Sequence, residues 1–370
     1  MEAIRALAGD IGPRPPGSRA EARAARWCAA HLQELGYEVT IEDFPTRTSY
    51  RPYYACYLGA SVVAALFAVP APLVGLVLGL AALVAYARDS DGRPPIPARS
   101  ATSCNVVARR AGEVVAPELI VSAHLDSARA ALNFHPRMVG TLRASVVVLQ
   151  GVLVAVPLLA AIAFVAGEGA PVVALWLGAG LCGTYLAVAI GLLVHAELRL
   201  PQVAGANDNA SGVEVVLRLA RFIDHHRVWF VLTGSEEAGM VGAGAFLDRH
   251  GHELGTARFL NLDSVGAGEV VAADEEGILV PRRADQAMVV AAERAGARIG
   301  TWRLLPTDGT AFLARGRRGL SLVAVDERGV IPNWHWPTDT PERIDPATLD
   351  SATAVALGVC RAVLGEGALP

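Results

Sequence analysis

The sequence predicts an α/β protein with a mainly parallel central sheet covered by helices, into which two transmembrane helical hairpins are inserted. Short runs of apolar and β-branched residues alternate with segments of helical periodicity, which is the pattern of a sheet covered on both faces. Two long apolar stretches interrupt this pattern. The chain is 53% hydrophobic and only 18% charged, whereas soluble domains carry about 25% charged residues.

The first elements of the expected body precede the apolar stretches. Ser18 followed three residues later by Glu21 resembles a capping box and opens a helix that ends at Gly36. Residues 38–44 alternate in hydropathy, as a half-buried strand does. Further strands are expected at 105–108, 119–122, 228–232, 258–262 and 320–325, and a helix at 212–223.

The two apolar stretches are expected to form hairpins. Residues 53–87 carry no charge and are divided by Pro70 and Pro72, while residues 144–194 contain Glu168 as their only charge. Each half of the second stretch has about the ~20 residues that cross a bilayer as a helix. Pairs of buried core helices, or re-entrant segments for the shorter stretch, are the alternatives.

Each hairpin enters and leaves on one side, so residues 1–52, 88–143 and 195–370 can fold as one body. Arginines flank the hairpins on the side of this body, and the hairpin tips carry no lysine or arginine. By the positive-inside rule the body faces the cytoplasm, which predicts an integral protein of the inner (cytoplasmic) membrane. A net charge of −4 gives no basic surface, so nucleic-acid binding is excluded.

Chemically active side chains follow the expected strands or stand in the loops near them. In chain order they are His124, Asp126, Asp208, Glu236, Glu237, Asp263 and His335. Since functional residues gather beyond the carboxyl ends of parallel strands, we expect these side chains to lie close together. Imidazoles and carboxylates are ligands that zinc accepts. Singly, each motif is explained by a surface turn, a helix cap or a half-buried histidine, but the ordered set favours a metal site.

In two pairs of nearby residues, the two members are expected to have different chemical roles. Of Glu236 and Glu237, one can bind a metal while the other takes a proton from a water molecule. Asp126 stands two residues after His124 and could accept the second ring N–H of that histidine, which would hold the imidazole in place.

Five motifs in one order resemble the family of co-catalytic di-zinc exopeptidases, which includes bacterial leucyl aminopeptidases, glutamate carboxypeptidases and glutaminyl cyclases. They are HxD at 124–126, GAxDNxSG at 205–212, SEExG at 235–239, LD at 262–263 and WHxxxDT at 334–340. The likeness also covers GPRPPGS at 12–18 and TDGTAF at 307–312. It implies the zinc exopeptidase fold for the body outside the hairpins.

The resemblance further implies a peptide substrate, two zinc ions and a mechanism. The implied ligands are His124 and Asp263 for one ion, Glu237 and His335 for the other, and Asp208 bridging both. A water molecule held between the ions would give its proton to Glu236 and attack the scissile carbonyl of an N-terminal residue, as in an aminopeptidase. Asp126 would orient His124, and Asp339 would support His335.

Two features depart from the family's pattern. The second hairpin interrupts the connection from His124 to Asp208, so the chain must return to the point where it left. This predicts an active site near the bilayer surface, with short or membrane-linked peptides as substrates. Gly309 stands where many members carry histidine, so the contacts of that side chain are not carried over.

Two other functions compete with the aminopeptidase. A glutaminyl cyclase has the same fold, typically holds one zinc ion, and has a tryptophan before its last histidine ligand, as Trp334 precedes His335. A catalytically silent membrane scaffold would keep the fold for interaction alone. Trp334 and Trp336 could wall a substrate side chain or cover the core.

Overall fold

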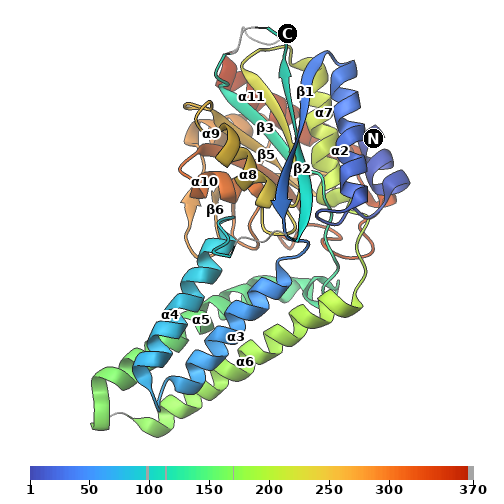
Figure 1. The fold of residues 1–370 in the computed structure, drawn as a ribbon. Helices are drawn as coiled ribbons and strands as arrows, with labels where there is room; N and C mark the ends of the chain where they lie inside the picture. Colours follow the sequence, from blue (N-terminus) through green and yellow to red (C-terminus); the bar gives the residue numbers. More distant parts are fainter. Residues whose placement is uncertain (97–99, 113–114, 170, 366–370) are drawn as a thin grey trace. The chain divides into compact units, whose positions relative to one another are not determined.

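The computed structural model describes residues 1–96, 100–112, 115–169 and 171–365. They form two compact units (Figure 1). Unit 1 comprises Met1–Ser49, Asp91–Ala130 and Pro201–Pro370, and unit 2 comprises Tyr50–Ser90 and Ala131–Leu200. The residues expected in the two hairpins, 53–87 and 144–194, lie within unit 2.

A nine-stranded sheet forms the centre of the described part of unit 1, in the order β1-β2-β4-β3-β5-β9-β6-β7, with β8 paired to β6. The strands are β1 (Tyr37–Thr46), β2 (Ala101–Arg110), β3 (Leu119–His124), β4 (Val228–Thr233), β5 (Arg258–Leu262), β6 (Glu269–Glu276), β7 (Arg282–Arg283), β8 (Arg298–Trp302) and β9 (Arg318–Val325). The central strands β4, β3, β5 and β9 run parallel. The pairs β1–β2, β2–β4 and β9–β6 are antiparallel. The predicted α/β class is confirmed, and the sequence missed β6, β7 and β8.

Helices cover both faces of this sheet (Figure 1). They are α1 (Glu2–Ile4), α2 (Arg19–Glu34), α7 (Gly212–Phe222), α8 (Val241–His250), α9 (Gln286–Arg294), α10 (Asp308–Ala314) and α11 (Pro346–Leu364). Successive strand residues point to opposite faces. In β4, Phe230 therefore joins the core formed with α2, α7, α9 and α11, while Trp229 and Val231 join the core formed with α8 and α10. Burial on both faces explains the continuous apolar runs of the central strands.

The helix α2 begins where the sequence predicts it. Its N-cap Ser18 accepts a hydrogen bond from the backbone N–H of Glu21. The carboxylate of Glu21 accepts hydrogen bonds from the N–H groups of Gly17 and Ser235, each at 2.7 Å. The glutamate of the expected capping box thus reaches the loop that carries Glu236.

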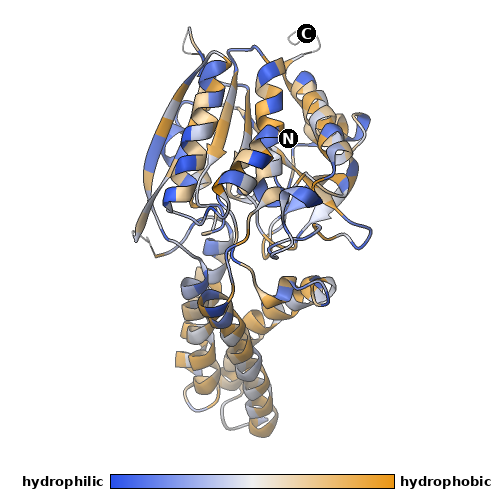
Figure 2. Cartoon of the chain, turned by 90° about the vertical axis from the view of Figure 1, so that its right-hand side faces the viewer, coloured by the Kyte–Doolittle hydropathy of each residue, from blue (hydrophilic) through white to orange (hydrophobic). Residues whose placement is uncertain are grey.

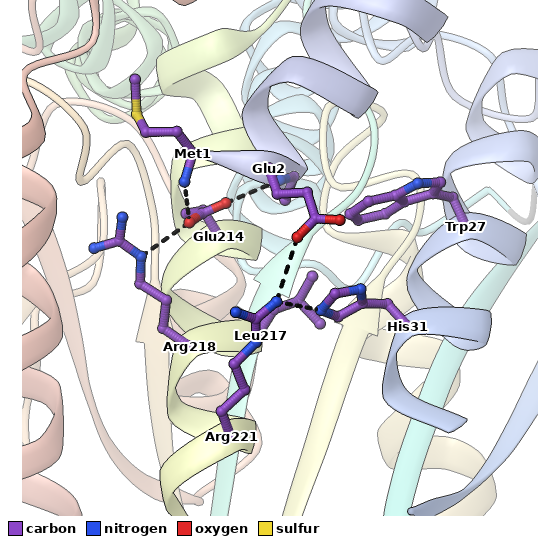
Figure 3. A pocket seen from close by; sticks show the side chains of 9 residues that line it. Met1, Glu2, Trp27, His31, Glu214, Leu217, Arg218 and Arg221 are labelled. Carbon is purple, nitrogen blue, oxygen red and sulfur yellow. Dashed lines mark hydrogen bonds and ion pairs between the residues drawn. The ribbon is translucent and has the colours of Figure 1, made fainter. Parts of the chain in front are cut away.

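A pocket of about 260 Å³ lies where α1 meets α2 and α7 (Figure 3). The amino group of Met1 pairs with the carboxylate of Glu214, which also accepts the N–H of Ala3 at 2.9 Å. Arg221 pairs with Glu2 across the same pocket at 3.4 Å. These contacts anchor the first turn of the chain to α7, the helix that follows the Asp208 loop.

The chain leaves unit 1 after Ala130 and returns at Pro201, and the two crossing segments pair with each other. The N–H of Ala130 donates to the carbonyl of Pro201, and the N–H of Val203 donates to the carbonyl of Ala128, each at 2.9 Å. An antiparallel bridge lies between these bonds. The ends of the inserted segment 131–200 are therefore joined within unit 1.

Unit 2 is built around four long helices, α3 (Arg51–Phe67), α4 (Pro72–Ser90), α5 (Leu142–Ala166) and α6 (Val172–Arg199). Helix α3 packs against α4 and α6, and α4 packs against α5, so the two hairpins interlock. Figure 2 shows that these helices are hydrophobic along most of their length. Large apolar side chains such as Val77, Val147 and Leu181 are exposed on them.

Four helices in the described part of the chain are long and apolar enough to cross a membrane: Pro72–Ser90, Val139–Ala166, Val172–Arg199 and Pro346–Leu364. The last is α11, whose Leu349, Val355 and Val359 are fully buried in the core of unit 1. Core packing explains the apolar composition of α11. Helix α3 has 17 residues and is about 26 Å long, a little short of the ~30 Å hydrocarbon layer.

The stacked rings of Phe259 and Phe312 form part of the core between β5 and α10, and a substitution there tests the contribution of this core to stability. Their centroids lie 4.1 Å apart, and both side chains are buried. Phe259→Ala leaves a cavity and is expected to lower the unfolding free energy of unit 1 by about 3–5 kcal/mol. Phe222→Ala, where the ring is 55% exposed on α7, should change it by less than about 0.5 kcal/mol. Urea unfolding followed by circular dichroism measures both, and equal losses would contradict this core.

Candidate metal centre

The polar side chains that the sequence singled out converge at one edge of the sheet. His124 is the last residue of β3, and Asp263 directly follows β5. Glu236 stands three residues after the end of β4. Asp208 lies in the loop before α7, and His335 lies in the loop after β9. The parallel strands end at the same edge, so side chains far apart in the sequence meet there.

Asp208 is the side chain that both histidines share. Its Oδ1 lies 3.0 Å from Nε2 of His124, and its Oδ2 lies 2.9 Å from Nε2 of His335. The carboxylate is only 3% exposed. Each oxygen of one buried carboxylate therefore faces one imidazole.

Two further carboxylates complete two groups around Asp208. Oδ1 of Asp263 lies 4.0 Å from Nε2 of His124, and Oε1 of Glu237 lies 3.2 Å from Nε2 of His335. Within each group the potential ligand atoms lie within 4.8 Å of one another. The structure thus brings together the five residues expected as ligands, with Asp208 in both groups, and Glu236 and Glu237 form a third group with His124.

The backbone at these ligands adopts conformations that glycine favours. Ser235 before Glu236, Ser264 after Asp263, and His335 itself have φ angles of 54°, 55° and 45°. A positive φ is unfavourable for residues with a side chain, so the surrounding contacts must hold these loops in place.

Asp126 holds the loop that carries both glutamates. Its Oδ1 accepts the N–H of Glu236 at 3.0 Å, and its Oδ2 accepts the N–H of Glu237 at 2.9 Å. The backbone carbonyl of Asp126 lies 3.2 Å from Nδ1 of His124, nearer than the carboxylate at 3.6 Å. Asp126 therefore positions the glutamate loop through its carboxylate and faces the ring of His124 with both its carbonyl and its carboxylate.

Two side chains from the loop after β9 hold Asp208. The carboxylate of Asp339 accepts the N–H groups of Asn207 and Asp208 at 2.7 and 3.1 Å. The indole N–H of Trp334 donates to Oδ2 of Asp208 at 2.9 Å. Asp339 thus positions Asp208, and Trp334 contacts the same residue directly; the expected support of His335 by Asp339 stays a prediction.

Sequence reasoning missed other polar residues that hold these loops. Glu21 binds the N–H of Ser235, and burial together with the charge of Asp126 raises the pKa of Glu21 to about 8. Asn209 accepts the N–H of Ser264 at 3.1 Å and so ties the Asp208 loop to the end of β5. The GAxDNxSG motif contains Asn209, but no local pattern reveals its partner.

Gly309 has no room for the histidine that many family members carry. A Cβ there would collide with Oγ of Ser321 and lie 2.8 Å from Oε1 of Glu276. Glu276 is fully buried and accepts hydrogen bonds from the hydroxyls of Thr307 and Thr310 at 2.7 and 3.1 Å. A buried hydrogen-bonded cluster therefore takes up the space that a side chain at position 309 would need.

Burial of so many carboxylates shifts their pKa values. Burial, with the charge of Asp208 adding to it, raises the pKa of Asp263 to about 7. Burial also raises the pKa of Glu236 well above its usual range. Burial would raise the pKa of Asp208 as well, but hydrogen bonds from His124 and His335 outweigh this and hold it far below its usual range. A divalent cation would relieve this repulsion, and the set of imidazole and carboxylate donors fits zinc.

The region that carries most of these residues matches a known family. The model of peptidase family M28 aligns with residues 191–360. This match covers 170 of the 370 residues. The M28 region includes every expected ligand except His124, which precedes it. The family resemblance is confirmed for this region, and no curated protein sequence matches the chain.

Solved structures share the fold. A zinc aminopeptidase from Bacillus subtilis, 16% identical, aligns over 97% of this chain and 93% of its own with a TM-score of 0.55. The LapA aminopeptidase of Legionella pneumophila, 9% identical, aligns over 98% of this chain and 70% of its own at 0.54. A Bacteroides thetaiotaomicron glutaminyl cyclase bound to N-acetylhistamine, 16% identical, aligns over 97% and 96% at 0.53. With the M28 match, the shared fold supports a zinc metallopeptidase.

The variant Asp263→Asn tests two effects of this carboxylate: its destabilisation of the metal-free protein and its contribution to zinc binding. The pKa of Asp263 is raised above that of an unfolded aspartate, so its contribution to stability falls as pH rises from about 4 to 7. In metal-free protein the variant should match wild type near pH 4 and exceed its stability by at least about 1 kcal/mol at pH 8. Saturating zinc should reverse this order, because the amide is a poorer ligand.

Urea unfolding at both pH values, with chelator and with zinc, measures the two effects of Asp263→Asn. A metal-free variant that is less stable than wild type at pH 8 would contradict the electrostatic explanation.

Proposed function

We propose that the chain is a di-zinc aminopeptidase that removes N-terminal residues from peptides and is held in the cytoplasmic membrane by α3–α6, with unit 1 on the cytoplasmic side. The observation that carries the enzymatic part is the shared carboxylate of Asp208, whose oxygens face His124 and His335 at 3.0 and 2.9 Å. A carboxylate whose two oxygens face different ligand groups can bridge two metal ions held ~3.5–4 Å apart. The M28 match supports a peptide substrate.

The donor set divides between two ions. The proposed ligands are His124 and Asp263 for one zinc ion, Glu237 and His335 for the other, and Asp208 for both. All five side chains are at most 10% exposed, so water competes little for them. Bound zinc would polarise the scissile carbonyl and lower the pKa of a water molecule there.

Glu236 is the residue proposed to move the proton. Its carboxylate lies within 4.8 Å of potential ligand atoms of His124 and Glu237, and its N–H is fixed by Asp126. Burial raises the pKa of Glu236 above its usual range, which favours a group that holds a proton for part of the cycle. Glu236 would take this proton from water and deliver it to the leaving amine.

Glu236 and Glu237 are neighbours on one loop, so each is the matched control of the other. Glu236→Gln should keep about two zinc ions per chain and lower kcat by at least ~100-fold, because the general base is lost. Glu237→Gln should lower zinc content and activity together, because a ligand is lost. Plasma emission on detergent-purified protein and hydrolysis of aminoacyl-anilides measure both. Wild-type activity in Glu236→Gln would contradict the role of Glu236 as the base. If neither the wild type nor the variants hydrolysed any substrate, the catalytically silent scaffold would be the remaining explanation.

A glutaminyl cyclase is the second candidate. The likeness to the Bacteroides thetaiotaomicron cyclase favours it, as does the position of Trp334 before His335. Zinc stoichiometry separates the two reactions. About two zinc ions per chain, lost with activity in Asp208→Ala, would support the hydrolase. One zinc ion with cyclisation of N-terminal glutamine would support the cyclase.

Unit 2 supports the proposed attachment to the membrane. Helices α5 and α6 have 25 and 28 residues, or about 38 and 42 Å, which exceeds the ~30 Å hydrocarbon layer. Tyr50, Tyr53 and Tyr54 lie beside or in the first turn of α3 and are partly exposed. Aromatic rings at helix ends are typical of the interface with lipid headgroups.

An arginine in the lipid-facing part of α6 tests this attachment. Val188 is 60% exposed near the middle of α6, and Leu198 is 71% exposed in its last turn. Val188→Arg should lower the membrane-integrated yield, because a central charge costs about 3 kcal/mol, whereas Leu198→Arg lies near the interface and should be tolerated. Alkaline extraction of membranes measures the integrated fraction. Wild-type protein released without detergent would contradict the attachment.

A further inference from the structure

The GPRPPGS segment takes no part in the chemistry proposed above, yet it lies against the metal centre. Arg14 from this segment is completely buried. We propose that Arg14 is a positioning residue of the metal centre, whose guanidinium fixes the spacing between the strand end that carries His124 and the loop that carries Asp208. This inference rests on the proposed metal-binding role of those two residues.

One planar group joins the two segments directly. Nε of Arg14 donates to the carbonyl of Leu125, the residue after His124, at 2.7 Å. Nη1 donates to the carbonyl of Ala204 at 2.7 Å, and Nη2 donates to the carbonyl of Gly205 at 2.9 Å. Because the guanidinium is rigid and planar, these hydrogen bonds hold the carbonyl groups at a set separation.

The same two segments are joined a second time through Ser127. The N–H of Arg14 donates to Oγ of Ser127 at 2.9 Å, and the N–H of Ser127 donates to the carbonyl of Arg14 at 3.0 Å. The hydroxyl of Ser127 in turn donates to the carbonyl of Val203 at 2.9 Å. Nη1 of Arg14 also donates to the carbonyls of Leu7 and Gly12 at 3.0 Å, which fixes the guanidinium in its own segment.

Gly205 allows this close approach. Its φ is +65°, and a Cβ there would collide with the carbonyl oxygen of Asp208 and lie 2.5 Å from Cβ of Ser127. The same atom would lie 3.1 Å from Nη2 of Arg14. The glycine that opens the GAxDNxSG motif is therefore required by its positive φ and by its close approach to Asp208 and Ser127, and it also leaves room for the guanidinium of Arg14.

The guanidinium also brings a fixed positive charge beneath three carboxylates. Burial lowers the pKa of Arg14 to about 10, so it stays protonated at neutral pH, and it interacts electrostatically with Asp126, Asp339 and Asp208. A lysine would keep the charge but could not span the carbonyls on both sides. Charge and geometry can therefore be separated by Arg14→Lys.

The covalent connection cannot set the spacing between His124 and Asp208. Residues 131–200, which lie between them in the chain, belong to unit 2. The separation of these two ligands must therefore come from contacts made within unit 1. The bonds of Arg14 and Ser127 are contacts of that kind.

Arg14→Lys tests the proposal with the full-length chain in detergent, and Arg317→Lys is the matched control. Arg317 donates to the carbonyls of Gly251 and Gly255 at 2.7 and 3.0 Å and does not touch the ligand-bearing segments. Arg14→Lys is expected to weaken zinc binding at least ~10-fold in competition with a chelating dye. It should also change the visible spectrum of the cobalt-substituted protein and lower kcat with KM unchanged. Arg317→Lys should leave all four quantities at wild-type values.

Ser127→Ala carries the test if Arg14→Lys does not fold. It keeps the guanidinium but removes the hydroxyl that accepts the N–H of Arg14 and donates to the carbonyl of Val203, and it is expected to weaken zinc binding by a smaller factor of about 3. Wild-type zinc affinity and an unchanged cobalt spectrum in the folded variant would overturn the positioning role. Two bound zinc ions without peptide hydrolysis in the wild type would overturn the aminopeptidase proposal alone, because zinc affinity and the cobalt spectrum need no substrate.

Discussion

The metal centre depends on one electrostatic constraint, which is the burial of several carboxylates where water cannot solvate them. An uncompensated charge in such a place is costly, so each carboxylate needs its own partners. Asp126 and Asp339 each accept two backbone N–H groups, and this compensation also fixes the loops that carry the ligands. Asp208 is compensated by two imidazoles, whereas burial still raises the pKa values of Asp263, Glu236 and Asp339. The imbalance that remains is negative and suits a divalent cation.

The long insertion at residues 131–200 makes it harder to hold His124 and Asp208 at a fixed separation. Loops at the carboxyl edge of a parallel sheet carry function, and long insertions there are tolerated where their ends stay together. Here the ends of segment 131–200 pair between Ala130 and Pro201. Close to them in sequence, the hydroxyl of Ser127 accepts the N–H of Arg14 and donates to the carbonyl of Val203. In a domain without the insertion, a short covalent connection would hold these two segments together. Here hydrogen bonds within unit 1 hold them together instead.

The sequence predicted the elements whose surroundings are uniform. The strands at 119–122 and 228–232 are buried on both faces and read as continuous apolar runs. β6 and β8 were missed because their burial is mixed and charged residues stand in both. The convergence of the residues expected as ligands could be predicted because each follows a strand or belongs to an ordered motif. Their supporting contacts could not be, since the bonds of Asp126 to the glutamate loop and of Arg14 to Gly205 join segments far apart in the chain and leave no local periodicity.

The hydrogen bond from Trp334 to Asp208 gives the centre an optical reporter. The indole N–H points at the carboxylate oxygen that also faces His335, and the ring lies 5.6 Å from that of Trp302. Any change in charge at that oxygen alters the electric field along the indole. A cation bound at that oxygen would therefore be expected to change the emission of Trp334, so the protein's own fluorescence offers a readout of metal binding without an added probe.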